Sequence, residues 1–171
     1  ADAAALLNAS ALAPYLHAQS EGAPWPTLAA LVAARARVVV LANFVGAQAA
    51  YESAWRGGAA PAWLLPYFRF AAETPFACSA ESDFGCAADR GALDSGAAFR
   101  PLYVVNHFLT DPVPNPVLAK RANRRESLEA HARACVAHAG RAPNVLNVDY
   151  WSVGSVVDVV GELNGVGSAP S

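Results

Sequence analysis

Three short segments of this sequence are mainly apolar and rich in β-branched residues, and they constrain the fold more than any other feature. They are residues 37–43 (RVVVLAN), 102–109 (LYVVNHFL) and 144–150 (NVLNVDY). A strand without polar alternation is buried on both faces, which is typical of a parallel sheet covered by helices. A weaker fourth strand is predicted at residues 70–74 (FAAET), directly before Pro75.

Helical segments alternate with these strands. Thr27 is a good N-cap for a helix over residues 28–36, and a longer helix is predicted over residues 117–139, ending at Gly140. A last short helix is predicted over residues 155–163. Because strands and helices alternate, we expect right-handed βαβ units and a parallel sheet, which is the α/β class.

Strands that are apolar on both faces need more covering and closing than this chain looks able to supply alone. We therefore predict that residues 1–171 form roughly the second half of a TIM-type β/α barrel, with the N-terminal half missing or present as a separate chain. On this hypothesis the strong strands are buried, including residues 38–41 and 145–148. The strands at residues 37–43 and 144–150 should also pair outward with strands outside this sequence.

Composition and the absence of certain motifs exclude several classes of function. The net charge is −2 and only 15% of residues are charged, which argues against binding nucleic acid through its phosphates. No run approaches the roughly 18 apolar residues of a membrane-spanning helix, so no transmembrane segment is predicted. The motifs of phosphate-binding loops, dinucleotide-binding folds, zinc ribbons and serine hydrolases are also missing.

Polar residues close all four predicted strands. In chain order they are Asn43, Glu73, Asn106 with His107, and Asp149. In a β/α barrel the carboxyl ends of the strands form the mouth of the active site. Any one of these residues could simply cap its strand or bind a loop, but their recurrence favours a shared polar pocket.

The other charged and titratable groups carry a weaker signal. His131 and His138 lie on the predicted helix of residues 117–139 without a carboxylate at ligand spacing, which favours packing or surface roles. The arginines of residues 121–125 (RANRR) are predicted to form a solvated face.

Three cysteines leave one without a partner inside the chain. Cys78 and Cys86 lie in a polar loop that could bring them together as a disulfide, with Cys135 free or linked to the missing half of the barrel. The competing interpretation is three buried thiols in an intracellular protein. A glycosylation sequon at Asn8 fits the first interpretation, so we predict a protein that is secreted or held at the extracellular surface.

Several short motifs occur in an order that resembles the PLC-like phosphodiesterases, relatives of the phosphatidylinositol-specific phospholipase C X domain. The resemblance runs from about Leu12 to Asn164 and includes Asn123. Its motifs are WPTL at 25–28, VVVLAN at 38–43, ETPF at 73–76, LYVVNHF at 102–108, GRAPN at 140–144 and VDY at 148–150.

The resemblance implies a β/α barrel that cleaves phosphodiesters at the mouth of its strands. In that family two histidines in the first half of the barrel act as general base and general acid. Only the second half is matched here, so His107 is not one of that pair, and Asn43 stands where many relatives have an aspartate. Asp149 is implied as the carboxylate that orients a histidine from the first half.

The remaining strand-end residues are assigned to catalysis and to the substrate. His107 and Asn106 are predicted catalytic residues that hydrogen-bond a phosphate or hydroxyl group, and Glu73, Asn43 and Tyr150 are the substrate-binding candidates. In the family, neighbours of the two histidines bind phosphate or calcium. A divalent cation such as calcium is therefore a candidate cofactor, although no metal ligand is assigned in this chain.

The sequence thus predicts part of a secreted phosphoric diester hydrolase of lipid metabolism. Its partners would be the N-terminal half of the same barrel and a phosphodiester or phosphoinositide-like substrate, and the chain alone would be inactive. The alternative is a catalytically inactive PLC-like barrel that serves as an extracellular structural or binding module. The two hypotheses differ in whether the upstream half carries both histidines.

Overall fold

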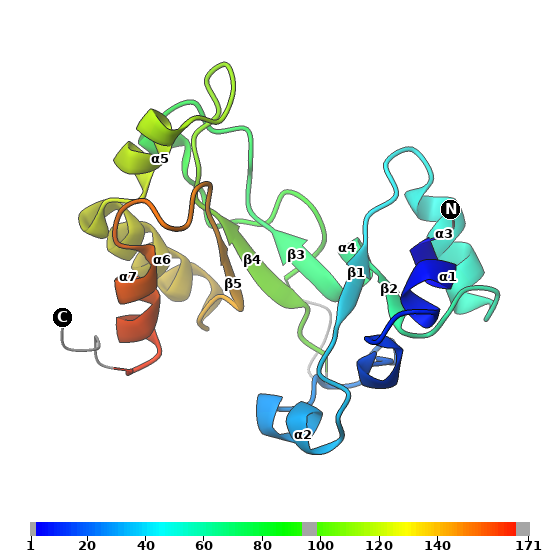
Figure 1. The fold of residues 1–171 in the computed structure, drawn as a ribbon. Helices are drawn as coiled ribbons and strands as arrows, with labels where there is room; N and C mark the ends of the chain where they lie inside the picture. Colours follow the sequence, from blue (N-terminus) through cyan, green and yellow to red (C-terminus); the bar gives the residue numbers. More distant parts are fainter. Residues whose placement is uncertain (1–2, 94–98, 167–171) are drawn as a thin grey trace. The chain divides into compact units, whose positions relative to one another are not determined.

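The computed structural model describes residues 3–93 and 99–166 and divides into two compact units (Figure 1). Unit 1 comprises Ala1–Ala71 and Asp94–Pro101, and unit 2 comprises Ala72–Leu93 and Leu102–Ser171. Both contain short parallel strands and helices, so the predicted α/β class is confirmed. The described residues form one sheet of two strands and one of three, and not a complete barrel.

Unit 1 is built around a two-stranded parallel sheet, in which Val40 pairs with Leu64. Thr27 caps a helix as predicted, since its Oγ1 accepts a hydrogen bond from the Ala30 N–H at 3.1 Å. The elements of unit 1 are α1 (Ala3–Asn8), η1 (Ala13–Tyr15), α2 (Leu28–Ala33), β1 (Val40–Ala42), α3 (Gln48–Arg56), β2 (Leu64–Pro66) and α4 (Tyr67–Phe70).

The strand β2 was not predicted from the sequence. It is three residues long and ends in a proline, so it carries neither the length nor the β-branched composition of a strand. It is nevertheless fully buried, because Leu65 joins Phe70 and Phe99 in the core of unit 1. Trp25 and Trp55 pack edge-on against Phe70.

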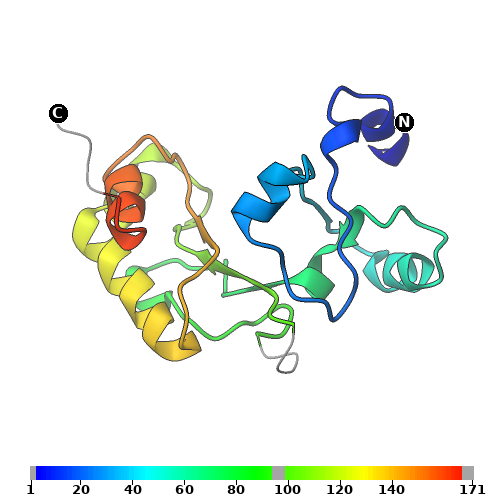
Figure 2. The same cartoon turned by 90° about the horizontal axis from the view of Figure 1, so that it is seen from below.

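Unit 2 contains a three-stranded sheet in the order β3-β4-β5, in which β4 and β5 are parallel and Asn106 pairs with Asn147. Figures 1 and 2 both show α6 and α7 lying side by side on one face of this sheet. The elements are β3 (Ala71–Glu73), η2 (Glu81–Asp83), β4 (Leu102–Asn106), α5 (Pro116–Ala122), α6 (Arg125–Ala139), β5 (Val145–Asn147) and α7 (Val156–Leu163).

The long helix predicted over residues 117–139 is two helices. Asn115 caps α5 by accepting hydrogen bonds from the N–H groups of Val117 and Leu118. Arg124 then adopts an extended conformation, which ends the first helix and begins α6. The predicted end at Gly140 is confirmed, since this residue has the left-handed φ of 64° that favours glycine.

Burial of the strands follows the prediction only in part. β4 is buried except at Leu102, and β1 is half-buried. The prediction is wrong for β5, where Val145 is 44% exposed. β5 is the last strand in its sheet, and only its middle residue, Leu146, is half-buried.

The predicted Cys78–Cys86 disulfide is wrong, and so is the predicted link from Cys135 to another chain. The structure joins Cys86 to Cys135 and leaves Cys78 as a buried free thiol. Cys135 lies on the buried face of α6, where it packs beside Cys86, whereas the Cys78 thiol faces the carbonyl oxygens of Pro75 and Asp83. The short spacing of Cys78 and Cys86 in the sequence was therefore a poor guide to the pairing. Helix α6 brings Cys135 to a Cα–Cα distance of 4.8 Å from Cys86, although the two are 49 residues apart.

No helix within the described part of the chain combines the length and the apolar character that crossing a membrane requires.

Candidate functional site

A row of polar side chains crosses the carboxyl ends of the three strands of unit 2. Each strand ends in one of its members: Glu73 on β3, Asn106 on β4 and Asn147 on β5. The Asn147 side-chain amide donates to Asn106 Oδ1 at 2.9 Å, and the Asn106 amide donates to Glu73 Oε2 at 3.3 Å. We call these three residues the strand-end row.

Neighbouring groups fix the orientation of the strand-end row. Thr74 holds Asn106 twice, because its Oγ1 accepts from the Asn106 backbone N–H at 2.9 Å and its carbonyl oxygen accepts from the side-chain amide at 2.6 Å. Glu73 forms an ion pair with Arg90, whose guanidinium lies over the Phe76 ring at 4.1 Å. The structure therefore brings together two of the predicted site residues, Glu73 and Asn106, and adds Asn147.

Asp149 follows β5 and differs from the strand-end row in its hydrogen bonding. Its Oδ2 is buried and has no hydrogen-bond partner among the described residues. Burial raises the pKa of the Asp149 carboxyl group, because removing a charge from water is unfavourable. A buried carboxylate oxygen without a donor among the described residues is able to accept a hydrogen bond from a further group.

Asn123, between α5 and α6, holds the loop that carries Asp149. Its side-chain amide donates to the carbonyl oxygens of Asp149 at 2.9 Å and of Val153 at 3.0 Å. Gly154 must be glycine, because a Cβ there would lie 2.3 Å from the Asn123 carbonyl oxygen and its φ is 84°. In the sequence, Asn123 stood out only as one part of the resemblance, and no local pattern indicates this role.

The other two predicted binding residues are solvent-exposed. Tyr150 is 46% exposed and has a left-handed φ of 52°, which turns the chain directly after Asp149. Asn43 is exposed and follows β1 in unit 1.

His107 lies apart from the strand-end row although it is next to Asn106 in sequence. Successive side chains of an extended strand point to opposite faces. The His107 ring is therefore fully buried among the helices, where its Nδ1 is 2.9 Å from His131 Nδ1 and its Nε2 donates to the Ala122 carbonyl oxygen at 2.8 Å. Phe84 stacks on the His131 ring.

Hydrogen bonding constrains the protons of this histidine pair. A carbonyl oxygen only accepts, so His107 Nε2 donates to Ala122, and His131 Nε2 faces the Gly85 carbonyl oxygen at 3.3 Å in the same way. One of the two Nδ1 atoms then donates to the other. Burial is the largest effect and lowers the pKa of His107 to about 4; the Ala122 hydrogen bond opposes it, and the smaller effects of His131 and Glu81 lower and raise the pKa respectively. Burial also lowers the pKa of His131. The pair connects β4 to α6.

Sequence reasoning missed this partnership, because it assigned His131 to packing or to the surface. No local pattern in the sequence indicates it, because His107 and His131 lie 24 residues apart and meet only where α6 packs against β4. His138 is exposed, as that reasoning allowed.

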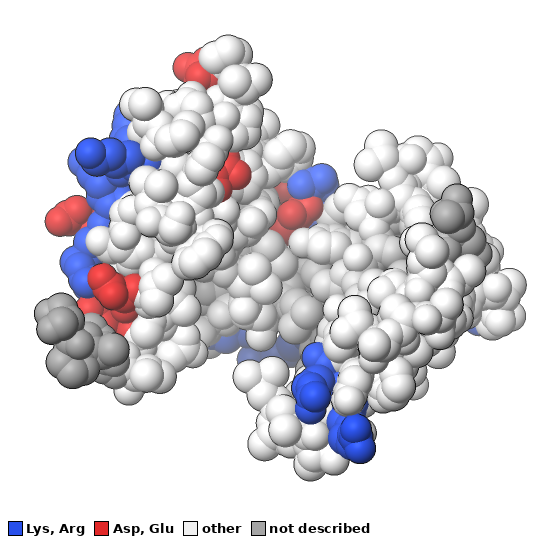
Figure 3. All heavy atoms as spheres, in the orientation of Figure 1, with Lys and Arg blue, Asp and Glu red and all other residues white. Residues whose placement is uncertain are grey.

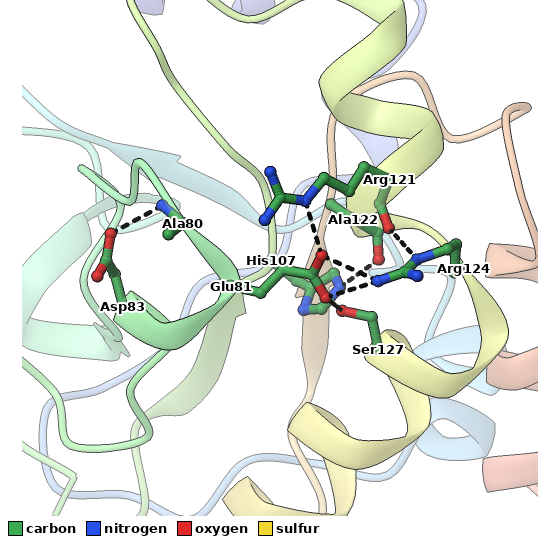
Figure 4. A network of polar contacts seen from close by, with 8 residues as sticks. All are labelled: Ala80, Glu81, Asp83, His107, Arg121, Ala122, Arg124 and Ser127. Atoms are coloured by element: carbon green, nitrogen blue, oxygen red, sulfur yellow. Dashed lines mark hydrogen bonds and ion pairs between the residues drawn. The ribbon is translucent and has the colours of Figure 1, made fainter.

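The loop after β3 is anchored to α5 and α6 through one carboxylate. Glu81 accepts hydrogen bonds from Arg121 Nε at 3.0 Å, Arg124 Nη2 at 3.0 Å and Ser127 Oγ at 2.8 Å (Figure 4). Burial alone would raise the pKa of Glu81, but these hydrogen bonds and the Arg124 charge outweigh it and lower the pKa. Figure 4 also shows His107 close to this network.

The arginines of residues 121–125 form part of an exposed basic face, as predicted. Figure 3 shows Lys and Arg side chains gathered over α5 and α6, with acidic side chains among them. Arg125 contacts Glu129, Asp158 and Glu162. Because acidic partners lie so close, this face is not a concentrated anion-binding patch.

The described residues do not fit a calcium ion. Calcium takes six to eight oxygen ligands. In the strand-end row, both Glu73 oxygens and the Asn106 oxygen are occupied by N–H donors. Outside the row, Asp149 offers one oxygen without a donor among the described residues. Within residues 3–93 and 99–166, the titratable groups close enough to share an ion are Cys86, His131 and Cys135, which is not an oxygen site.

The chain is similar in sequence to one protein family and to two fungal proteins. The family model described as PI-PLC X 1 matches residues 2–164. An "Uncharacterized secreted protein" of Arthroderma benhamiae is 31% identical over 159 residues, and "PI-PLC X domain-containing protein 1" of the same fungus is 30% identical over 150 residues.

Each of these alignments covers 83% of the chain. The chain spans only 34% and 45% of the length of these two relatives. No solved structure matches the chain with comparable significance.

Proposed function

The chain belongs to the PI-PLC X domain family, and from that premise we propose that it supplies the C-terminal half of a secreted β/α barrel that hydrolyses phosphodiesters. In this proposal the general acid and general base are histidines of the N-terminal half, and this chain provides an orienting carboxylate, substrate-binding groups and one side of the active-site mouth.

The observation that carries the proposal is the buried, unpartnered oxygen of Asp149. It lies just beyond the carboxyl end of β5, where active-site residues of β/α barrels are found. A carboxylate that accepts the Nδ1–H of an imidazole fixes its tautomer and stabilises the imidazolium formed during proton transfer. Asn123 holds the backbone at Asp149, so the carboxylate is positioned before any partner arrives.

The strand-end row would bind the substrate beside this carboxylate. Side-chain amides such as that of Asn147 can contact phosphate or hydroxyl oxygens, and the exposed ring of Tyr150 can cover the leaving group. His107 is fully buried and uses both ring nitrogens inside the protein, so it holds the end of β4 instead of touching the substrate.

The edge of β5 would receive the first strand of the N-terminal half. β5 stands at the end of the sheet order, and Val145 on it is exposed. Next to it lies a groove of about 580 Å³ formed by α6, α7 and β5, whose apolar walls include Val136, Leu146 and Val160. A parallel strand added at this edge, with its helix over the groove, would bury these groups.

We also propose that the protein is secreted and glycosylated at Asn8. One relative is named a secreted protein, and a disulfide such as Cys86–Cys135 persists in oxidising compartments. Asn8 is exposed at the end of α1, so a glycan could be attached without disturbing a core. Loss of mass on treatment with a peptide N-glycosidase, absent in Asn8→Gln, would test this.

The catalytic proposal is tested with the native protein and phosphatidylinositol vesicles. Asp149→Asn should lower kcat about a thousandfold or more, with KM within about twofold, and change the pH profile of kcat. Asp158→Asn is the matched control, because this carboxylate is exposed on α7 and contacts Arg125 at 3.8 Å. Full activity of Asp149→Asn would exclude the orienting role. Absence of hydrolysis by the native protein, on lipid and soluble phosphodiesters, would favour the non-catalytic extracellular module.

The half-barrel proposal is tested separately. Residues 1–171 expressed alone should associate or aggregate, because an uncovered strand edge and groove face solvent. A soluble monomer that unfolds cooperatively would contradict the half-barrel. Intact-mass measurement of the native material, with and without reduction, should show a longer chain or a companion peptide, and a single species of this chain's 17.7 kDa would contradict it as well.

A further inference from the structure

We propose that the chain has a second, metal-binding function in its reduced state: the thiolates of Cys86 and Cys135, together with His131, bind a borderline or soft divalent ion such as Zn²⁺. One ligand atom from each residue lies within 4.8 Å of the others. This site lies on the His107 side of β4, is independent of the phosphodiesterase proposal and uses none of its residues.

Local structure already places the three ligands. His131 and Cys135 are four residues apart on α6 and therefore share one helix face. Cys86 reaches them from the loop after η2, and its Cα is 4.8 Å from that of Cys135, so both sulfurs can reach one ion without moving the backbone far.

The surroundings suit a metal as well as a disulfide. His131 and Cys135 are buried, and the apolar side chains of Tyr103, Val105 and Leu146 pack around the sulfur atoms. Cys86 is half-buried, which leaves a path for the ion and a fourth position for water.

His107 provides the outer contact that metal-bound histidines require. If His131 coordinates through Nε2, that atom exchanges its long contact with the Gly85 carbonyl oxygen (3.3 Å) for the ion, while its Nδ1 keeps the hydrogen bond with His107 Nδ1 that fixes the ring. The Phe84 ring, stacked on His131, limits its rotation. Two thiolates and an imidazole favour zinc over calcium or magnesium, which prefer oxygen ligands.

The chemistry balances with a dithiol as reductant. The dithiol is oxidised to its own disulfide, while Cys86–Cys135 takes up two electrons and two protons and becomes two thiols. Metal binding then releases those two protons, because only thiolates coordinate. The ion would hold the Cys86 loop to α6 whenever the disulfide is open, for instance before oxidation during secretion.

The test uses the native protein, reduced with a phosphine under anaerobic conditions and titrated with Co²⁺ as a spectroscopic substitute for zinc. We expect thiolate-to-cobalt charge-transfer absorption and the visible bands of a tetrahedral ion at one equivalent. His131→Gln should weaken binding about tenfold or more, since even outer contacts contribute 10- to 100-fold. His138→Gln on the same helix is exposed and should bind cobalt like the wild type.

A second measurement needs no variant. In the reduced wild type, Zn²⁺ should slow alkylation of Cys86 and Cys135 and leave the rate at the free thiol Cys78 unchanged. The oxidised protein should give no charge-transfer absorption. The proposal is overturned if the reduced protein shows none either, if zinc protects Cys78 instead, or if His131→Gln binds cobalt as tightly as the wild type.

Discussion

The two sides of the end of β4 behave differently although they begin at adjacent residues. Asn106 joins the strand-end row, where side chains hydrogen-bond one another at the edge of the sheet. His107 points the other way and contacts the Phe84 ring and the buried His131 of α6. The pleat of the strand thus places adjacent residues on opposite faces of the sheet: Asn106 on the face suited to binding a substrate, and His107 on the face that contacts the helices.

The sides also differ in how they are stabilised. On the His107 side, aromatic packing holds two histidine rings away from water, and a disulfide links the Cys86 loop to α6. On the Asn106 side, amides and a carboxylate are fixed by hydrogen bonds and one ion pair. Four changes, two on the His107 side and two on the Asn106 side, should therefore lower the free energy of unfolding by different amounts. They should also differ in their dependence on pH and on salt.

The largest effect is expected from the disulfide. It closes a loop with a sequence separation of 49, so replacing both cysteines by serine (Cys86→Ser with Cys135→Ser) should lower the free energy of unfolding by about 4 kcal/mol. Urea unfolding of the native protein, with chelator present, measures it. Cys78→Ser removes a thiol without opening the loop and is the control. An equal decrease in the free energy of unfolding in both variants would show that closure of the loop does not stabilise the protein.

Acidification should affect the His107 side next. Burial lowers the His107 pKa from 6.5 to about 4, so the unfolded chain takes up a proton first as the pH falls. The free energy of unfolding contributed by this ring is complete above about pH 6.5 and is lost progressively towards pH 4. The loss should reach about 3 kcal/mol, and His131, whose pKa is also lowered, adds in the same direction.

Comparison with His107→Gln isolates this contribution from that of the carboxylates. Glutamine keeps an N–H that can reach the Ala122 carbonyl oxygen but does not titrate. The difference in unfolding free energy between wild type and variant should shrink as the pH falls from 7 to about 4. A difference that stays constant across this range would mean that His107 is not held neutral.

Local elements of unit 2 could be predicted from the sequence, whereas the contacts between them could not. The β-branched run before Asn106 identified β4, and the Gly140 signal identified the end of α6, because both depend on local backbone preferences. The Cys86–Cys135 pairing and the contact of His107 with His131 depend on how α6 packs against the sheet, which no spacing along the chain encodes.

The same limit applies to the candidate site. Polar strand ends were visible in the sequence, and Glu73 and Asn106 do lie together in the structure. Asn147 was overlooked, because an asparagine inside an apolar run looks like an interruption and not the end of β5. Asn123 acts from the break between two helices that the sequence pattern merged into one.

On the Asn106 side, removing the central amide should cost less than the disulfide. Asn106→Ala deletes the bonds to Glu73, Thr74 and Asn147 and should lower the free energy of unfolding by about 2 kcal/mol, because buried partners lose their hydrogen bonds. The loss should not vary between pH 7 and about 5. A pH-dependent loss in this range would show that the two sides of β4 are coupled.

The smallest effect is expected at the edge of the strand-end row. Glu73→Gln keeps an oxygen that accepts from Asn106 but gives up the charge that attracts Arg90, whose side chain is 36% exposed. Partly exposed ion pairs contribute about 1 kcal/mol or less and weaken in salt. The variant should therefore lose under about 1 kcal/mol in unfolding free energy at low salt, and the difference from wild type should fade as sodium chloride is raised. A larger, salt-independent loss would mean that the Glu73 charge supports the row from within, and the row would then depend on a buried ion pair and not on its amides.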